Sequence, residues 1–393
     1  MPLSAPAAAS LRARGTRLPG RADPRGSIWA SMLRAGLIGF PTTGKTTLFR
    51  LMTSPREAAR GGHHGKAEAS VGISRVPEER LDRLTAMYNP RKRVPATVEL
   101  ADIAGAAPAA AKDLLDVAPF RNAEALLHVV RMFRDPGVPN PRGTVNPPRD
   151  ARAMEDELIL ADLGLVERRL QRIDRDLKKG PSPELRREHD VLAGCKAVLE
   201  DARPLRTAGL ADDDLKRLRG FQLLSAKPLL VVLNLDEADI AAVDRAVELA
   251  GLGEFLAAAG ASAVGVCGRI ELEIAELDNA DRAPFLADVG LKEPGLDRVI
   301  RASYDLLGFI SFFTVGEDEC RAWSIPRGTP AQEAAGEIHT DIARGFIRAE
   351  VVSYEHLVSR GSMAACRDHG EVRLEGKDYV VKDGDVVNFR FAT

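Results

Sequence analysis

The chain has 393 residues and a net charge of −2, from 55 Lys and Arg and 57 Asp and Glu residues. Hydrophobic residues make up 45% and charged residues 28%, so collagen-like, fully disordered and disulfide-scaffold proteins are excluded. At roughly 150 residues per domain, the length predicts two or three domains. The balanced charge also excludes a nucleic-acid binder that is basic over its whole surface, but it leaves a local basic face open.

The first 32 residues differ in composition from the rest of the chain. Five arginines and one acid, Asp23, are scattered among Pro and Gly, and no apolar segment of a secretory signal is present. This composition is compatible with a transit peptide. We favour a disordered extension or a mis-called start, because Met32 directly precedes the first strand-like run.

The next segments alternate between apolar runs and helix-compatible stretches. Residues 33–39 predict a buried strand, and residues 40–52 predict a loop and a helix. Such alternation favours a parallel sheet that is covered by helices on both faces. Further short strands are predicted at 97–102, 125–131, 228–234 and 263–267.

Residues 151–225 interrupt this alternation with a helical hairpin. Apolar residues recur at intervals of four and three from Ile159 to Leu177, which is the pattern of a helix–helix seam. Gly180 and Pro181 end the first helix, and Ser182 is expected to cap the next helix with Pro183 at its first position. Two seams joined by a short turn predict an antiparallel hairpin inserted into the first domain.

From residue 306 the pattern changes to a small α+β domain, with a mixed sheet wrapped on one helix at 330–342. Asp383-Gly384 is a tight-turn signal before the last strand. Strands are predicted at 312–315, 321–325, 348–352, 378–381 and 386–391. The predicted domains are therefore an extension at 1–32, an α/β domain at 33–150 and 226–305, the hairpin at 151–225 and the C-terminal domain at 306–393.

The segment Gly39-Phe40-Pro41-Thr42-Thr43-Gly44-Lys45-Thr46 has the GxxxxGK[ST] pattern of a phosphate-binding loop. Backbone N–H groups of such a loop wrap a phosphate, and the following helix points its positive end at the anion. Lys45 is predicted to reach the β- and γ-phosphates. The Thr46 hydroxyl is predicted to ligate Mg²⁺. Lys45 is accordingly the one catalytic residue that we assign.

Two further motifs follow predicted strands of the same sheet. Asp102 is expected to hold Mg²⁺ through water, and Gly105 would let its N–H approach the γ-phosphate. Asn234-Leu235-Asp236-Glu237 stands where guanine-specific proteins usually have NKxD. Because Glu237 is longer than the aspartate of that motif, base choice is expected to be loosened or shifted towards adenine. An Asn side chain can pair with the N6/N7 edge of a purine.

These motifs together make the chain resemble the YchF subfamily of Obg-like P-loop NTPases, from about residue 33 to residue 393. The resemblance also rests on VPEERL, LLHVVRMF and the C-terminal stretches RAWSIPRGTPAQEAAGEIHTDIARGFIRAEV and LEGKDYVVKDGDVVNFRF. It implies a P-loop NTPase domain with a parallel-rich sheet, the inserted hairpin and a C-terminal β-grasp domain of the TGS type. It further implies Mg²⁺-dependent binding of ATP, with GTP as the alternative, and association with ribosomes or RNA.

The resemblance assigns site residues one by one. Asn234 and Leu235 would contact the base, Leu235 through its backbone. The phosphate-binding set would comprise Gly39, Thr42, Thr43, Gly44, Lys45, Thr46, Thr47 and Gly105, and the metal set Thr46 and Asp102.

Three departures from the family pattern predict slow hydrolysis. Lys66 stands where the family has the switch threonine that completes the Mg²⁺ shell. Residues 106–111, Ala-Ala-Pro-Ala-Ala-Ala, replace a glycine-rich mobile loop. Asn140 stands where the family often has a histidine linked to hydrolysis, and Asn is no general base near neutral pH. The alternative is a nucleotide-binding pseudo-NTPase that acts as a sensor or assembly factor.

The cysteine content and the apolar runs indicate the cellular compartment and whether the chain can span a membrane. The four cysteines are Cys195, Cys267, Cys320 and Cys366; they form no CxxC pair, so neither a zinc site nor a disulfide framework is indicated. A reducing cytoplasmic compartment fits this usage. No apolar run reaches the roughly 18–20 residues that a membrane span needs, and no membrane association is expected.

Overall fold

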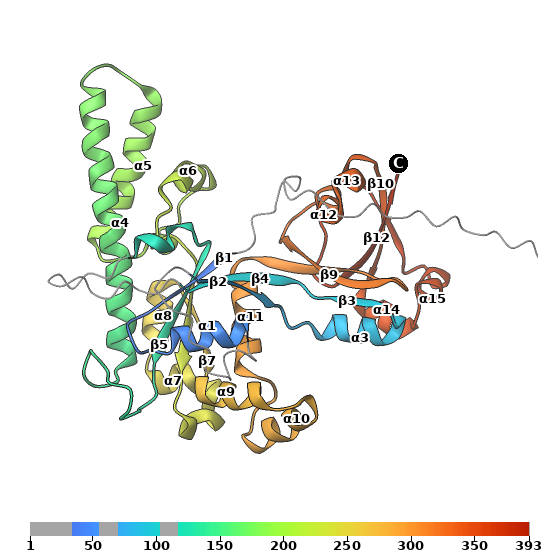
Figure 1. Ribbon diagram of the computed structural model, residues 1–393. Helices are drawn as coiled ribbons and strands as arrows, with labels where there is room; N and C mark the ends of the chain where they lie inside the picture. The colour runs from blue at the N-terminus through green and yellow to red at the C-terminus, as the bar shows by residue number, and fades with distance from the viewer. Residues whose placement is uncertain (1–33, 55–69, 103–116, 393) are drawn as a thin grey trace, which may run out of the picture.

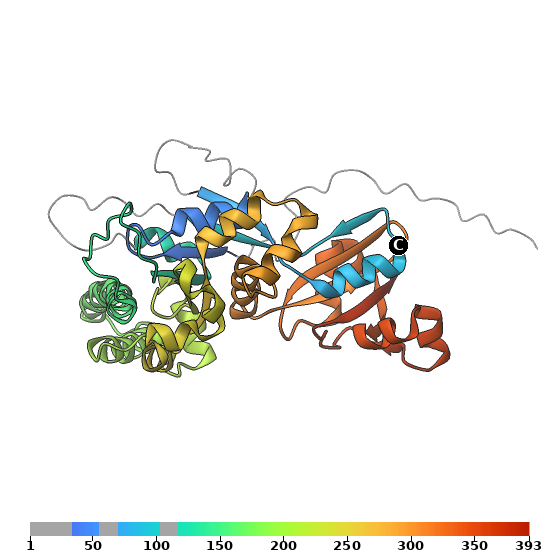
Figure 2. The ribbon, with the colours of Figure 1, turned by 90° about the horizontal axis from the view of Figure 1, so that it is seen from below.

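The computed structural model of the chain describes residues 34–54, 70–102 and 117–392. These residues form two bodies, each built on a six-stranded sheet, with a helical hairpin that projects from the first body (Figure 1). In the perpendicular view the two bodies lie side by side and the hairpin helices are seen nearly end-on (Figure 2). Within these ranges no helix is long and apolar enough to cross a membrane.

The first sheet has the strand order β2-β4-β1-β5-β6-β7. Neighbouring strands are parallel except for β2, which runs antiparallel to β4. The two strands β5 and β6 are buried at every position, as expected for central parallel strands covered on both faces. The strands are β1 (Arg34–Ile38), β2 (Ser70–Arg75), β4 (Thr97–Asp102), β5 (Ala125–Arg131), β6 (Leu229–Asn234) and β7 (Ser262–Val266).

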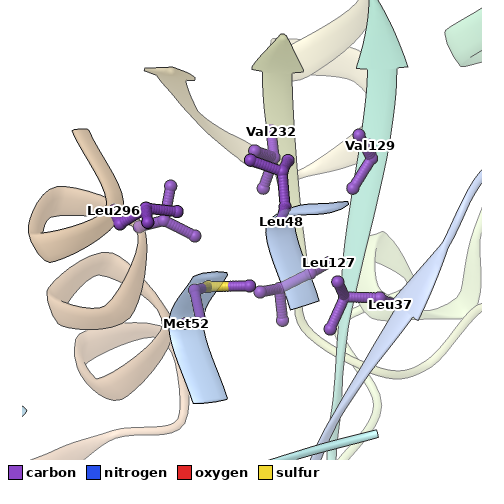
Figure 3. A pocket seen from close by; sticks show the side chains of 8 residues that line it. Leu37, Leu48, Met52, Leu127, Val129, Val232 and Leu296 are labelled. Carbon is purple, nitrogen blue, oxygen red and sulfur yellow. The ribbon is translucent and has the colours of Figure 1, made fainter. Parts of the chain in front are cut away.

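Helices cover both faces of this sheet. On one face, Leu48 and Met52 of α1 (Lys45–Thr53) point toward Leu127 and Val232, and Leu296 of α11 (Gly295–Leu306) lies beside them (Figure 3). The opposite face packs against the hairpin base and short helices. The other helices of this body are α6 (Asp212–Leu218), α7 (Ala246–Ala250), α8 (Gly253–Ala259), α9 (Gly268–Glu276) and α10 (Asn279–Asp288).

The hairpin consists of α4 (Pro147–Leu177) and α5 (Pro183–Glu200). Its seam is apolar: Ile159, Val166 and Ile173 are buried in one cluster with Leu192 and Leu199. Ser182 caps α5 as predicted, because its Oγ accepts a hydrogen bond from the Leu185 N–H at 3.3 Å.

The second sheet has the order β11-β10-β12-β8-β9-β3 and wraps on α12 (Ala331–Ile338). Buried alanines of α12 allow its close approach to the aliphatic and aromatic side chains of the sheet. The predicted fold class, α/β with an inserted hairpin and a C-terminal β-grasp domain, is confirmed. The strands are β3 (Lys92–Val94), β8 (Phe309–Thr314), β9 (Glu319–Pro326), β10 (Phe346–Ser353), β11 (Arg373–Glu375) and β12 (Asp385–Phe391).

The segment between β2 and β4 joins the two bodies. Its strand β3 pairs in parallel with β9, at the edge of the second sheet. Its helix α3 (Glu79–Tyr88) buries Leu81 and Leu84 in the same cluster as Phe313 and Val386 of the second body. The strands β2 and β4 of the first sheet are therefore linked by a segment that packs on the C-terminal domain.

Two details of the predicted C-terminal domain are wrong. Residues 378–381 form no strand: the Tyr379 carbonyl accepts from the Ala331 N–H and the Val381 N–H donates to the Thr329 carbonyl, so this backbone bonds to the turn before α12. The predicted helix at 330–342 is broken at His339, which is extended at φ −165°. The second piece is α13 (Thr340–Arg344), and two more helices follow, α14 (Tyr354–Arg360) and α15 (Met363–Asp368).

Candidate functional site

The loop between β1 and α1 is shaped to surround an anion. Thr42 (φ 62°) and Gly44 (φ 95°) both adopt left-handed conformations. Such conformations in a short loop turn successive backbone N–H groups toward a common centre. A Cβ on Gly44 would lie 2.4 Å from Nδ2 of Asn234, so only glycine fits at this position. The positive end of α1, which begins at Lys45, faces the same loop.

Lys45 lies folded over the loop from which it emerges. Its Nζ donates hydrogen bonds to the carbonyls of Gly39 at 2.8 Å and Phe40 at 2.6 Å. Burial lowers the pKa of Lys45 to about 8, and the nearby carboxylate of Asp102 partly offsets this shift. Among the described residues, the hydrogen-bond acceptors of this ammonium group are neutral carbonyls.

The predicted metal residues lie next to each other. Asp102 is the last residue of β4, 4% exposed, and its Oδ1 has no hydrogen-bond partner among the described residues. Burial raises the pKa of Asp102, while a hydrogen bond from Thr46 and the charge of Lys45 act in the opposite direction. A carboxylate and a hydroxyl oxygen are ligands that Mg²⁺ prefers, so this pair fits the ion.

Two other threonines of the loop have different environments. Thr43 is buried, and its hydroxyl donates to the Phe40 carbonyl at 3.1 Å, so this side chain holds the loop in shape. Thr47 is half-buried in the first turn of α1. For both residues, contact with phosphate through the backbone N–H stays a prediction.

Asn234 links two loops at the end of β6. Its Nδ2 donates to the Thr43 carbonyl at 3.0 Å, and its Oδ1 accepts from the Gly268 N–H at 2.9 Å. The side chain is 5% exposed. Its oxygen and one amide hydrogen are therefore used to hold the phosphate loop against the start of α9, which the sequence did not indicate.

The residues after Asn234 line the same edge of the sheet. Leu235 is 1% exposed, and its N–H donates to the Val266 carbonyl at 2.7 Å. Glu237 forms an ion pair with Arg269 of α9. The carboxylate at the fourth position of the motif thus already has a cationic neighbour.

The loop between β5 and α4 contacts the phosphate loop from outside, and the sequence motifs do not predict these contacts. The Thr42 hydroxyl donates to the Pro139 carbonyl at 3.1 Å, and the guanidinium of Arg142 lies 4.1 Å from the ring centroid of Phe40. Arg131, at the end of β5, hydrogen-bonds both the carbonyl and the hydroxyl of Thr42. Its position at a strand end beside a P-loop was the available signal.

Asn140 lies in this outer loop, next to Pro139. Its Oδ1 accepts from the Arg142 N–H at 3.1 Å, and its Nδ2 is buried without a partner among the described residues. Three predictions fall on Lys66, Gly105 and residues 106–111, which lie outside the described residues.

Comparison with known proteins places this geometry in a family. The family model YchF-GTPase_C, described as "Protein of unknown function (DUF933)", matches residues 309–392. The "Ribosome-binding ATPase YchF" of Bacillus subtilis (strain 168) is 40% identical over 363 residues, which cover 91% of this chain and 99% of the relative. The chain belongs to the YchF family.

Further comparisons extend this membership across the chain. The protein of the same name from Escherichia coli O157:H7 is 38% identical over 365 residues, covering 91% of this chain and 99% of the relative. A solved structure, the Schizosaccharomyces pombe YchF GTPase, has a TM-score of 0.80 and 27% identity; the match covers 93% of this chain and all of that one. The YchF family resemblance that the motifs predicted is confirmed.

Proposed function

We propose that this YchF-family protein binds ATP together with Mg²⁺, with GTP as the second candidate, and hydrolyses the γ-phosphate with water. The observation that carries the proposal is the loop around Lys45, with its left-handed turns, its following helix and the Nζ held over its carbonyls. The names of the relatives, "Ribosome-binding ATPase YchF", support the same activity and suggest the ribosome as partner.

Each part of the loop has a role in this function. Lys45 exchanges its carbonyl contacts for oxygens of the β- and γ-phosphates, and the backbone N–H groups from Thr42 to Thr47 donate to the phosphates. Both stabilise the charge that develops as water attacks. Thr46 and Asp102 would hold Mg²⁺, which neutralises charge on the β- and γ-oxygens when bound.

The base site favours ATP in this proposal. Guanine readers use a short aspartate to accept hydrogen bonds from the base. Here the corresponding residue is Glu237, which is longer and is paired with Arg269. Because this carboxylate already has a partner, we expect ATP to bind at least as tightly as GTP. Asn234 and the Leu235 backbone are the proposed base contacts.

We propose that hydrolysis is slow. The proposal rests on Lys66 in place of the switch threonine, on residues 106–111 in place of a glycine-rich loop and on Asn140. An Asn at that position orients water by hydrogen bonding but takes up no proton near neutral pH. Among the described residues the Asn140 Nδ2 is buried without a hydrogen-bond partner, and the carbonyl of the preceding Pro139 accepts from the Thr42 hydroxyl of the phosphate loop. The same residues support the second candidate, a pseudo-NTPase that senses nucleotide without useful turnover.

Single-turnover hydrolysis separates the two candidates. Purified protein, in excess over ATP, is mixed with ATP in the presence of Mg²⁺ and K⁺, with and without ribosomes. The Lys66→Thr and Asn140→His variants are measured in the same way. Slow turnover that either substitution accelerates supports the proposed ATPase. No turnover under any condition favours the pseudo-NTPase, and robust turnover unaffected by both variants contradicts the assigned roles of Lys66 and Asn140. Co-sedimentation with ribosomes, with and without nucleotide, tests the partner.

A further inference from the structure

Arg131 carries a buried positive charge beside the phosphate loop. The residue is 4% exposed at the carboxyl end of β5. Its Nη2 donates to the Val138 carbonyl at 2.8 Å and its Nε to the Phe133 carbonyl at 3.1 Å. Its Nη1 lies 3.3 Å from Oγ1 and 3.4 Å from the carbonyl of Thr42. All of these acceptors are neutral.

No carboxylate of the described residues forms an ion pair with Arg131. Arg206, whose side chain is 6% exposed, shows the usual arrangement, because its Nη1 lies 2.9 Å from the Glu155 carboxylate. Burying a guanidinium without a counter-ion is costly, so buried charges are normally paired. Arg131 departs from this arrangement: among the described residues its guanidinium has neutral acceptors and the Phe133 ring, whose centroid lies 4.3 Å away, but no carboxylate. Its charge is therefore free to act on an anion that binds nearby.

The position of Arg131 identifies that anion. Thr42 has the left-handed conformation that turns the loop backbone inward, and a β-branched residue rarely adopts it. Arg131 holds Thr42 from the outer side, while the Thr42 hydroxyl is fixed on the Pro139 carbonyl. The backbone of Thr42 therefore lies between the Arg131 guanidinium and the loop N–H groups that are proposed to bind a phosphate.

We propose that Arg131 is a positioning residue for the polyphosphate of the nucleotide. Arg131 fixes Thr42 so that the N–H groups of the loop converge. It also supplies a second positive charge, on the side of the loop opposite the bound phosphate, in addition to the charge of Lys45. The bound β-phosphate neutralises this charge across the backbone. The inference rests on the proposed nucleotide site, and it concerns affinity rather than turnover.

Two substitutions separate the charge from the hydrogen bonds. Arg131→Gln keeps amide donors for the carbonyls but removes the charge, and Arg131→Lys keeps the charge with fewer donors. We expect the Gln variant to bind ADP at least tenfold more weakly than the unmodified protein, measured by calorimetry with Mg²⁺ and again with EDTA. The Lys variant should stay within threefold. Arg206→Gln, at a paired arginine away from the loop, should leave ADP affinity unchanged.

The contrary results are equally distinct. ADP affinity that is unchanged in Arg131→Gln, or reduced equally in the Gln and Lys variants, would overturn the role of the charge. Urea unfolding without nucleotide checks that each variant folds; if Arg131→Gln does not, Arg131→Asn, which also keeps amide donors without the charge, replaces it with the same expectation. An unmodified protein that binds no ADP contradicts the proposed function itself, which is a different outcome from binding that ignores Arg131.

Discussion

The side-chain amide of Asn234 donates a hydrogen bond to the main-chain carbonyl of Thr43, 3.0 Å away and 191 positions earlier in the chain. The oxygen of the same side chain accepts from the Gly268 N–H. One buried residue thus fastens the phosphate loop to the start of α9. The motif at 234–237 therefore has this structural role in addition to its proposed role in binding the base.

Asn234→Ala should destabilise the protein and weaken nucleotide binding. The substitution leaves the buried Gly268 N–H without its acceptor, which costs about 1–3 kcal/mol. Urea unfolding measures this loss, and calorimetry with ATP measures the affinity. The exposed Asn388, which is 3.5 Å from Glu350, offers a control: Asn388→Ala should change stability little. Equal stability of the two variants would show that the bridge contributes nothing.

Thr42→Asn should stabilise the nucleotide-free protein. A left-handed conformation costs an ordinary residue roughly 1–2 kcal/mol, whereas Asn tolerates it better. We expect a gain of about 0.5–1 kcal/mol in the free energy of unfolding. Thr42→Val, which keeps the branched side chain but loses the hydrogen bond to Pro139, should instead lower stability. Thr42→Asn loses the same hydroxyl, so an Asn variant that is no more stable than Thr42→Val would argue against strain at this residue.

The affinity for ATP should fall as the pH rises from 7 to 9. The pKa of Lys45 in the free protein is about 8, and only the ammonium form attracts phosphate. One pH unit above that pKa, about a tenth of the lysine is charged, so affinity should drop about tenfold. Lys45→Arg keeps its charge through this range, and its affinity should be independent of pH. The same slope in both proteins would assign the titration to another group.

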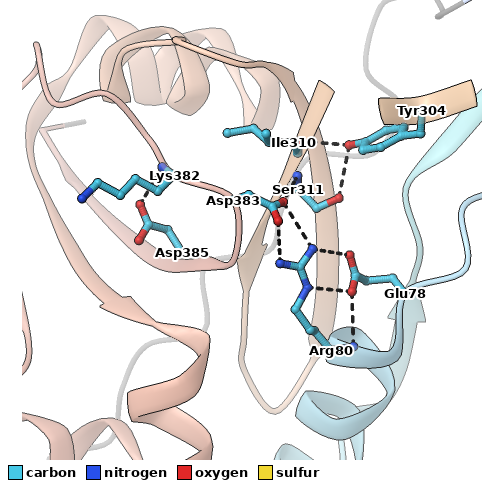
Figure 4. Close-up of polar contacts among 8 residues, drawn as sticks. All are labelled: Glu78, Arg80, Tyr304, Ile310, Ser311, Lys382, Asp383 and Asp385. Carbon is cyan, nitrogen blue, oxygen red and sulfur yellow. Dashed lines mark hydrogen bonds and ion pairs between the residues drawn. The ribbon is translucent and has the colours of Figure 1, made fainter. Parts of the chain in front are cut away.

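The C-terminal domain should lose stability when its ion pair with α3 is broken. Arg80 donates from Nη1 to Asp383 at 2.8 Å and also binds Glu78, and Asp383 accepts from the Ser311 N–H (Figure 4). In a double-mutant cycle of Arg80→Ala and Asp383→Ala, we expect a coupling of about 0.5–1 kcal/mol, since both side chains are partly exposed. Additive effects would show that this ion pair contributes nothing to holding α3 against the C-terminal domain.

Local patterns predicted much of the fold. The strand at Thr97–Asp102 and the strand at Ala125–Arg131 have the predicted bounds, because short runs rich in apolar and β-branched residues are typical of buried parallel strands. Ser182 and Pro183 stand at the cap and first position of α5 because capping depends only on neighbouring residues. The phosphate loop was equally predictable, since its chemistry lies in one short segment.

Contacts between distant segments were not predictable. The pairing of β3 with β9 joins residues 92–94 to 319–321, and three residues carry too little pattern to specify a partner. The contact of Arg131 with Thr42 depends on where β5 ends relative to the loop. Residues 378–381 end in two β-branched valines that favour a strand, but their backbone bonds to the turn before α12. Tertiary context decided each of these cases.

Calorimetric titration of the unmodified protein and Lys45→Ala, each with ATP and with GTP in the presence of Mg²⁺, tests the central claim most directly. We predict that ATP binds at least as tightly as GTP. Lys45→Ala should weaken ATP binding more than tenfold, because a charge-assisted contact of about 1.5–3 kcal/mol is lost. Undetectable binding of both nucleotides, or ATP affinity that is unchanged in a folded Lys45→Ala variant, would contradict the account.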